Sequence, residues 1–141
     1  SKKLLLAVDI NDPEAARPST EAAVRMARHE DAALHVVNVV PDQGMAIVSA
    51  ALPPDHSETA QSAAQKGLEA WAKDSIHEDL LPVLHIAYGT IYDQIISTAY
   101  ALDVDCVIVG ARSPTLKDYL IGPNAARVAR HASQSVFVVR Q

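Results

Sequence analysis

Near its start the chain carries a continuous apolar run that ends in an acid, Leu4-Leu-Leu-Ala-Val-Asp9. The run is aliphatic throughout and does not alternate with polar residues. That pattern is typical of a strand buried on both faces in a parallel sheet. Further runs of the same kind predict strands at Leu34–Val40, Leu81–Ala87, Asp105–Val109 and Ser135–Val139.

Segments with helical periodicity lie between these runs. They predict four helices, at about Ala15–Glu30, at about Ser57–His77, from Thr90 to about Leu102, and after Gly122. In the first helix we expect Pro18 in or near the first turn, where its fixed φ angle is favourable. In the second helix, an apolar stripe runs through Leu68 and Trp71 to Ser75. At the start of the third helix, Thr90 and Asp93 have the spacing of a capping box.

Strands that alternate with helices predict parallel βαβ units with right-handed crossovers. We therefore expect one α/β domain over residues 1–141, with helices on both faces of an open parallel sheet. The one long irregular stretch, Pro41–His56, contains Gly44, Pro53 and Pro54. It is too long for a plain connection, which favours a lid or a mobile flank.

Composition narrows the class of function. Hydrophobic residues make up 49% and charged residues 21%, as in a folded domain, and only 4% are aromatic, so the core is aliphatic. The net charge of −5 and the lack of a basic stripe argue against nucleic acid as a partner. The lone Cys106 fits a reducing compartment and is expected to pack in the interior. Asp9 ends the first apolar run too early for a membrane span or signal peptide, so we expect a cytoplasmic protein.

The segment after the fourth predicted strand is the richest candidate for binding. Parallel sheets bind ligands beyond the carboxyl ends of their strands. Here Gly110 permits close approach of a ligand to the backbone, and Gly122 precedes a helix N-terminus that favours an anion. Arg112 and Lys117 supply positive charge. On spacing alone, both glycines are equally consistent with simple turns.

Several segments together follow the pattern of a known family. They are Leu-Ala-Val-Asp9, Gly89 after the third strand, Val-Ile-Val-Gly110, and the final Ala126-Arg-Val-Ala-Arg-His-Ala-Ser-Gln-Ser-Val-Phe-Val-Val139. The chain resembles the universal stress proteins over essentially its whole length, and Asp118–Ala126 is closest to the F/G-type branch. The resemblance implies a Rossmann-like fold of the adenine nucleotide alpha hydrolase type, with a five-stranded parallel sheet of order 3-2-1-4-5.

The resemblance also implies a ligand, which is ATP or another adenine nucleotide, with or without Mg²⁺. It assigns Ala7, Val8 and Asp9 to the adenosine side, Val39 and Val40 to the flanks of adenine, and Gly89 to the ribose. From the residues alone, Asp9 has an alternative role as the cap of the first helix. The loop positions implied to meet the phosphates are Gly110, Arg112, Ser113, Gly122, Pro123, Asn124 and Ala125.

The loop departs from the family pattern Gly-x2-Gly-x9-Gly-Ser/Thr. Ser113 replaces the second glycine, and eight residues rather than nine separate it from Gly122. Both departures are similar to F/G-type members. Pro123 replaces the phosphate-binding Ser or Thr, and proline has neither a hydroxyl nor a backbone N–H.

No catalytic residue and no metal site are predicted. The sequence has no Gly-x-Ser-x-Gly elbow and no Walker-type phosphate loop, and Ser113 has no histidine nearby in the sequence to activate it. None of the histidines forms a helical i, i+4 pair with another. We expect them to be scattered over the surface and the helix ends: His29, His35, His56, His77, His85 and His131.

The favoured interpretation is a nucleotide-binding stress-response protein that acts through an unidentified protein partner selected by nucleotide. Two alternatives remain, a dimeric interaction protein that has lost triphosphate binding and a slow ATP hydrolase. A homodimer through Ser135–Val139 is also expected. This apolar strand would lie at the sheet edge, and the family commonly dimerises through it.

Overall fold

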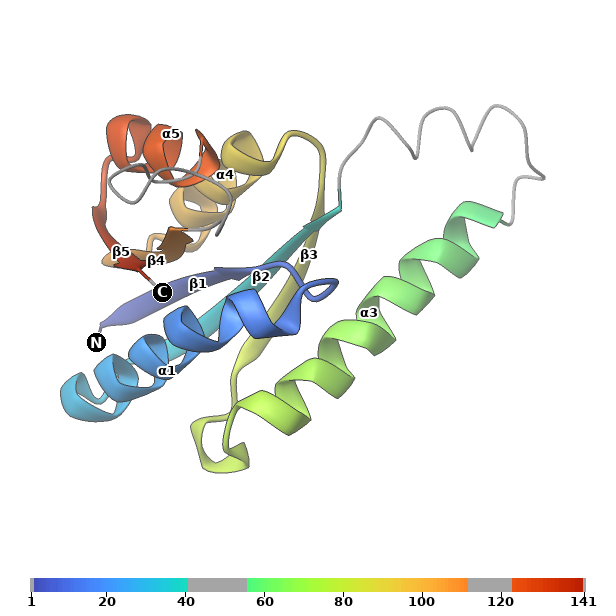
Figure 1. Ribbon diagram of the computed structural model, residues 1–141, viewed down its shortest axis with the longest axis horizontal. Coiled ribbons are helices and arrows are strands. Elements are labelled where there is room, and N and C mark those ends of the chain that lie inside the picture. The colour runs from blue at the N-terminus through green and yellow to red at the C-terminus, as the bar shows by residue number, and fades with distance from the viewer. Residues whose placement is uncertain (1, 41–55, 112–122, 141) are drawn as a thin grey trace.

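Five strands form a single parallel sheet in the order β3-β2-β1-β4-β5 (Figure 1). This computed structural model describes residues 2–40, 56–111 and 123–140. The order and the direction of the strands confirm the sequence prediction. The strands are β1 (Lys3–Val8), β2 (Ala33–Val40), β3 (Val83–Tyr88), β4 (Cys106–Ala111) and β5 (Ser135–Arg140).

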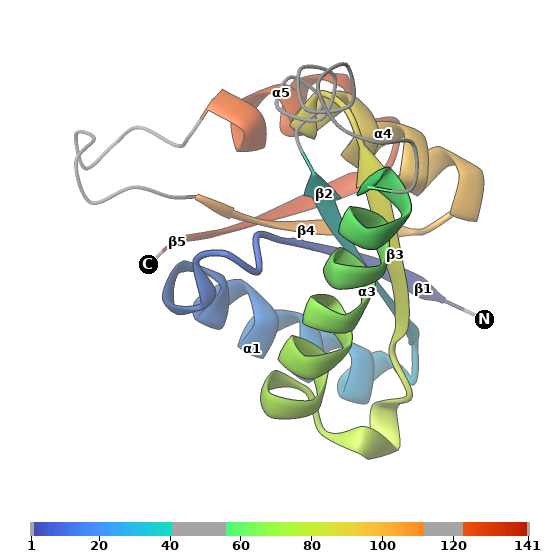
Figure 2. The ribbon, with the colours of Figure 1, turned by 90° about the vertical axis from the view of Figure 1, so that its right-hand side faces the viewer.

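Helices cover both faces of the sheet (Figure 2). On β1, Leu4 and Leu6 pack toward α1 and α3, whereas Leu5 packs toward α4 and α5. None of the three is more than 1% exposed, which explains why the run that forms β1 is apolar without a break. The helices are α1 (Pro13–Glu30), α3 (His56–Ser75), α4 (Ile91–Leu102) and α5 (Pro123–His131), with a 3₁₀ turn, η1, at Glu78–Leu80.

Helix α1 begins earlier than expected. Asp12 is its N-cap, because the Asp12 carboxylate accepts a hydrogen bond from the Ala15 N–H at 3.4 Å, and Pro13 occupies the first position. Pro18 therefore lies in the helix interior and not in or near the first turn. There it removes the N–H that would otherwise reach the Glu14 carbonyl.

Two other local predictions are wrong. Thr90 is the N-cap of α4, but its side chain makes no capping hydrogen bond, so the predicted capping box with Asp93 does not form there. Strand β3 begins at Val83 rather than Leu81. The chain leaves η1 through Leu81 in the left-handed region, at φ 46°, which is incompatible with a strand.

The predicted stripe on α3 holds in its middle. Leu68, Trp71 and Ala72 are buried. Ser75 is exposed, and Ile76, just beyond the end of the helix, is buried in its place. The predicted long connection lies outside the described residues, except for His56, which begins α3. Among the helices that the structure describes, none is both long and apolar enough to cross a membrane.

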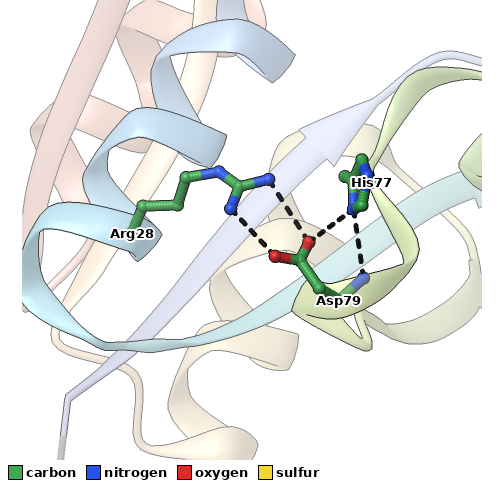
Figure 3. A network of polar contacts seen from close by, with 3 residues as sticks. All are labelled: Arg28, His77 and Asp79. Atoms are coloured by element: carbon green, nitrogen blue, oxygen red, sulfur yellow. Dashed lines mark hydrogen bonds and ion pairs between the residues drawn. The ribbon is translucent and has the colours of Figure 1, made fainter.

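A polar network joins the end of α1 to η1 on the side of the sheet where the strands begin (Figure 3). We call this side the amino edge. Arg28 donates two hydrogen bonds to the Asp79 carboxylate, at 3.0 and 3.3 Å. His77 Nδ1 lies 2.7 Å from Asp79 Oδ1 and 3.4 Å from the Asp79 backbone N. With a proton on Nδ1 the imidazole donates to the carboxylate, and without one Nδ1 accepts the Asp79 N–H. The hydrogen bonds from Arg28 first, and then from His77, hold the pKa of Asp79 below its usual value.

His35 of β2 and His85 of β3 form a second polar contact, which the sequence did not predict. Their nitrogens Nδ1 and Nε2 lie 3.0 Å apart, and the rings stack with centroids 5.2 Å apart. Burial lowers the pKa of both imidazoles, and the neighbouring His85 and Lys3 lower that of His35 further. These two histidines are therefore a neutral, partly buried pair rather than scattered surface groups.

Cys106, on β4, is only partly buried and is a free thiol. It packs at the border of the core beneath α1. Burial, as the largest cause, raises the pKa of this thiol, and the carboxylates of Glu30 and Asp105 add to the effect. The thiol therefore stays protonated and is a poor nucleophile.

Candidate functional site

A cavity of about 240 Å³ lies where β1, β2 and β4 end and where α1, α4 and α5 begin. The strand order reverses between β1 and β4, so the cavity occupies the topological switch point of the sheet. The structure brings together most of the residues that the sequence assigned to the site. Those that line the cavity are Ala7, Val8, Asp9, Val39, Val40, Gly110, Asn124 and Ala125.

The remaining predicted positions fall into two groups. Gly89 and Pro123 are described by the structure but are not among the residues that line the cavity. Pro123 is the exposed first residue of α5. Arg112, Ser113 and Gly122, with the neighbouring Lys117, lie outside the described residues.

Gly89 supports the site from the turn between β3 and α4. Its φ angle is 140°, and a Cβ added there would lie 2.9 Å from Gln94 Nε2. The Gly89 N–H donates to the carbonyl of Val40 at 3.0 Å. Glycine is required here by backbone conformation, and the turn fixes Val40, which does line the cavity.

Gly110 contributes empty space and not an unusual backbone conformation. A Cβ added to Gly110 would lie 3.6 Å from Ser19 Oγ, an ordinary van der Waals distance. Ser19 is buried and donates its hydroxyl to the Ala16 carbonyl at 3.1 Å. Because Gly110 has no side chain, the space between β4 and this part of α1 remains open.

The turn after β1 exposes the side chain of Asp9 at the cavity. Asp9 Oδ1 accepts the Asn11 N–H, and the Asp9 carbonyl accepts the Asp12 N–H, both at 3.0 Å. Since Asp12 caps α1, the alternative role of Asp9 as the helix cap is wrong. The helix does not need the Asp9 carboxylate, which is exposed and can accept hydrogen bonds from a ligand.

Sequence reasoning missed Asn38, which lies inside the apolar run of β2 and also borders the cavity. It is 4% exposed, and its Oδ1 accepts the Ile10 N–H at 3.3 Å. A polar residue near the carboxyl end of a buried strand was the signal that could have found it. Ile91 and Ile95 add an apolar wall from α4. Two isoleucines one helical turn apart are equally typical of a helix face that packs on a core, so their spacing did not single them out.

Residues 1–140 match the family model described as the Universal stress protein family. The chain belongs to this family. It is similar to universal stress protein G of Shigella flexneri, with 29% identity over 143 residues and 99% of each chain covered. That name agrees with the F/G-type likeness of Asp118–Ala126.

Solved structures of other universal stress proteins share the fold. One, from Archaeoglobus fulgidus in complex with dAMP, has a TM-score of 0.62 and 19% identity, and the match covers 99% of this chain and 98% of that one. Another, in complex with cAMP, has a TM-score of 0.64 and 16% identity, with 99% and 96% covered.

The cavity of this universal stress protein has walls of different polarity and charge. Aliphatic side chains form much of its wall, as with Val39 and Ile95. Asp9 brings negative charge on the β1 side, while the N-terminus of α5, with Asn124 and Ala125, favours an anion on the other. Among residues 2–40, 56–111 and 123–140, no group of three His, Cys, Asp or Glu side chains converges to hold a metal ion.

Proposed function

We propose that this universal stress protein binds an adenine nucleotide in the cavity at the switch point and acts as a nucleotide-dependent stress-response protein. The observation that carries the proposal is the cavity itself. Residues chosen from separate parts of the sequence, such as Asp9, Val40 and Asn124, line one space at the position where parallel sheets bind ligands.

The chemistry of the walls supports one orientation for the nucleotide. Apolar contacts from Val39 and Val40 suit the faces of a purine, and the Asp9 carboxylate suits the hydroxyls of a ribose. Phosphates would be repelled by Asp9 and attracted to the start of α5, where the N–H groups of Asn124 and Ala125 lie. In this proposal Arg112, Ser113 and Gly122 complete the phosphate site.

The size of the cavity supports a nucleoside. Ligand pockets commonly measure roughly 300–1,000 Å³. The 240 Å³ cavity is just below that range, so it suits a base and a ribose with the phosphates extending out of it toward α5. The complexes of similar proteins with dAMP and cAMP support an adenine nucleotide as the class of ligand.

Calorimetry with ATP, ADP and AMP, together with mass spectrometry of small molecules released from the purified protein, tests this proposal. Gly110→Val places two methyl groups in the cavity beside Ser19 and should weaken nucleotide binding at least about tenfold, about 1.4 kcal/mol. Gly110→Ala is the matched control, since its Cβ makes only ordinary contact. A folded Gly110→Val variant with unchanged affinity would place the site elsewhere.

Pro123 favours a second candidate function, an interaction protein that has lost triphosphate binding. As the first residue of α5 it cannot donate a backbone hydrogen bond to a phosphate. Under this alternative, AMP or adenosine binds and ATP gains nothing from its additional phosphates. Equal affinities for AMP and ATP would support it.

We also propose that the protein forms a homodimer through β5. This edge strand pairs only with β4 among the described strands, and its Phe137 is 43% exposed. Pairing with a second copy would cover both the open backbone edge and Phe137. Phe137→Glu should convert a dimer to a monomer in sedimentation, whereas Tyr100→Glu, at a 79% exposed residue of α4, should not. A wild-type monomer at about tens of micromolar, near ordinary affinities, would contradict the proposal.

A further inference from the structure

Asn38 is a buried amide in apolar surroundings at the carboxyl end of β2. Its neighbours along the strand are Val37 and Val39, and its partner on β1 is Val8. Only 4% of Asn38 is exposed, yet it borders the cavity. The small exposed part of the residue is therefore on the side from which a ligand would approach.

The orientation of the Asn38 amide is fixed by its contact with the backbone. The Ile10 N–H is a donor, so the side-chain atom that it meets at 3.3 Å is the oxygen. The amide nitrogen, Nδ2, is then turned away from Ile10. Within the part of the chain that the structure describes, this nitrogen has no hydrogen-bond acceptor.

The unused nitrogen remains accessible. Among the described residues, no side-chain nitrogen or oxygen is both fully buried and without a hydrogen-bond partner. Since Asn38 Nδ2 lacks a partner there, it keeps contact with the open space, and the cavity is the space that Asn38 borders. Ser19 also borders the cavity, but its hydroxyl already donates to the Ala16 carbonyl.

The accessible amide nitrogen matters once a ligand binds. In the empty protein, water in the cavity can hydrate Nδ2, and a bound ligand displaces that water. An acceptor supplied by a ligand satisfies the donor in an environment of low dielectric, where hydrogen bonds are strong. A ligand that presents a C–H or a donor at the same place leaves the amide unsatisfied and is rejected.

We propose that Asn38 determines the specificity of the cavity by donating a hydrogen bond from Nδ2 to an uncharged acceptor on the nucleoside half of the ligand. The inference rests on the proposed nucleotide-binding function. The acceptor is a ring nitrogen of the base or an oxygen of the ribose. The Asn38 oxygen holds the turn after β1 through the Ile10 N–H. One side chain therefore fixes the cavity wall with its oxygen and recognises the ligand with its nitrogen.

Asn38→Asp is the sharpest variant because it preserves shape and the acceptor for the Ile10 N–H. At pH 7 a carboxylate cannot donate, so the affinity for AMP should fall about tenfold. Lowering the pH toward 5 should restore the affinity relative to wild type, since burial favours the protonated acid, which can donate again. Asn11→Asp adds the same charge on an exposed residue of the cavity rim and reports the effect of charge alone.

Calorimetry with AMP analogues identifies the acceptor. Three analogues, 1-deaza, 3-deaza and 7-deaza AMP, each lack one ring nitrogen. Two more, 2′-deoxy and 3′-deoxy AMP, each lack one hydroxyl. Wild type should bind one of these about tenfold more weakly than AMP, and Asn38→Asp should not distinguish that analogue from AMP. Such non-additivity marks a direct contact.

Three outcomes would overturn the inference. Wild type could bind every analogue as tightly as AMP, a measurement that does not depend on a folded variant. Folded Asn38→Asp could bind AMP as wild type does at pH 7, or each analogue could lose the same factor in both proteins. In all three cases the proposed function survives, because AMP still binds. Failure of wild type to bind any adenine nucleotide would instead remove the proposed function, and this inference with it.

Discussion

The sheet has an amino edge, where its strands begin, and a carboxyl edge, where they end. Polar groups at these two edges have opposite roles. At the amino edge, polar groups are paired with one another, as in the contacts of Asp79 with Arg28 and His77, or of the Lys3 N–H with Asp105 at 2.8 Å. At the carboxyl edge, Asp9 and Asn38 present hydrogen-bonding atoms to a cavity.

This difference separates stability from binding. Polar groups that satisfy one another fasten elements together and leave nothing for a ligand. Polar groups held by one atom, with another atom open to the cavity, fasten fewer elements together and keep an atom that can bond to a ligand. Substitutions at the two edges should therefore change different measurements.

At the carboxyl edge, Gly89→Ala should give the largest effect. A side chain at φ 140° is strained, and its Cβ would meet Gln94 Nε2 at 2.9 Å, so the free energy of unfolding should fall by about 1–3 kcal/mol. Urea denaturation measures this change. Gly110→Ala is the control and should stay within about 0.5 kcal/mol of wild type. Equal stability of the two variants would show that the turn at Gly89 carries no strain.

Pro123→Ser should act on binding and leave stability nearly unchanged. The variant restores a backbone donor and adds a hydroxyl at the start of α5, each worth about 0.5–1.5 kcal/mol, so ATP should bind about tenfold more tightly. AMP should gain less, because fewer phosphates reach α5. Pro13→Ser makes the same change at the first position of α1, whereas the proposed phosphate site is at the start of α5. Calorimetry in which Pro123→Ser and Pro13→Ser give the same affinities would mean that Pro123 does not face the phosphates.

The pair of His35 on β2 and His85 on β3 should make stability depend on pH. The pKa values of His35 and His85 are lowered in the folded protein, so the unfolded chain binds more protons below about pH 6.5. Stability should therefore be full above that pH and fall as the pH drops through it. Urea denaturation at several pH values should show a shallower loss in His35→Gln. A loss as steep as that of wild type would show that the pair does not cause it.

Asp79→Asn should have the smallest effect. The pKa of Asp79 is lowered by the hydrogen bonds from Arg28 and His77, so its contribution is present above the usual value of 3.8 and is lost as the pH falls through the lower, folded value. All three side chains are well exposed, so the change at pH 7 should be smaller than that of Gly89→Ala. Thermal unfolding at pH 7 and about pH 3 measures it. A difference between variant and wild type that persisted unchanged at the lower pH would contradict the assignment.

The fold was predictable because β1 and its neighbours are buried on both faces. An unbroken aliphatic run as short as Leu4–Val8 is typical of a strand covered by helices on each side, and the family likeness supplied the strand order. Local ends were less predictable. Asp9 and Asp12 are equally good cap residues by type, and only the geometry of the turn after β1 decides between them.

The candidate site was predictable where a motif named its residues, as at Asp9 and Gly110. The site was not predictable at Asn38. This residue lies within a buried strand, where the sequence pattern indicates a core position and not a ligand contact. The contact of His35 with His85 was missed for a different reason. The two are 50 residues apart in the sequence and meet only because β2 and β3 are neighbours in the sheet.

The central position of β1 has a consequence for synthesis of the chain. Its partner on one side, β2, follows soon after it, but Lys3 and Asp105, which join the starts of β1 and β4, are 102 residues apart. At about 5–20 residues per second, a ribosome needs roughly 5–20 s to reach β4 after completing β1. During that time one side of the apolar β1 has no paired strand. The nascent chain is therefore prone to aggregation at this stage, and chaperones would protect it.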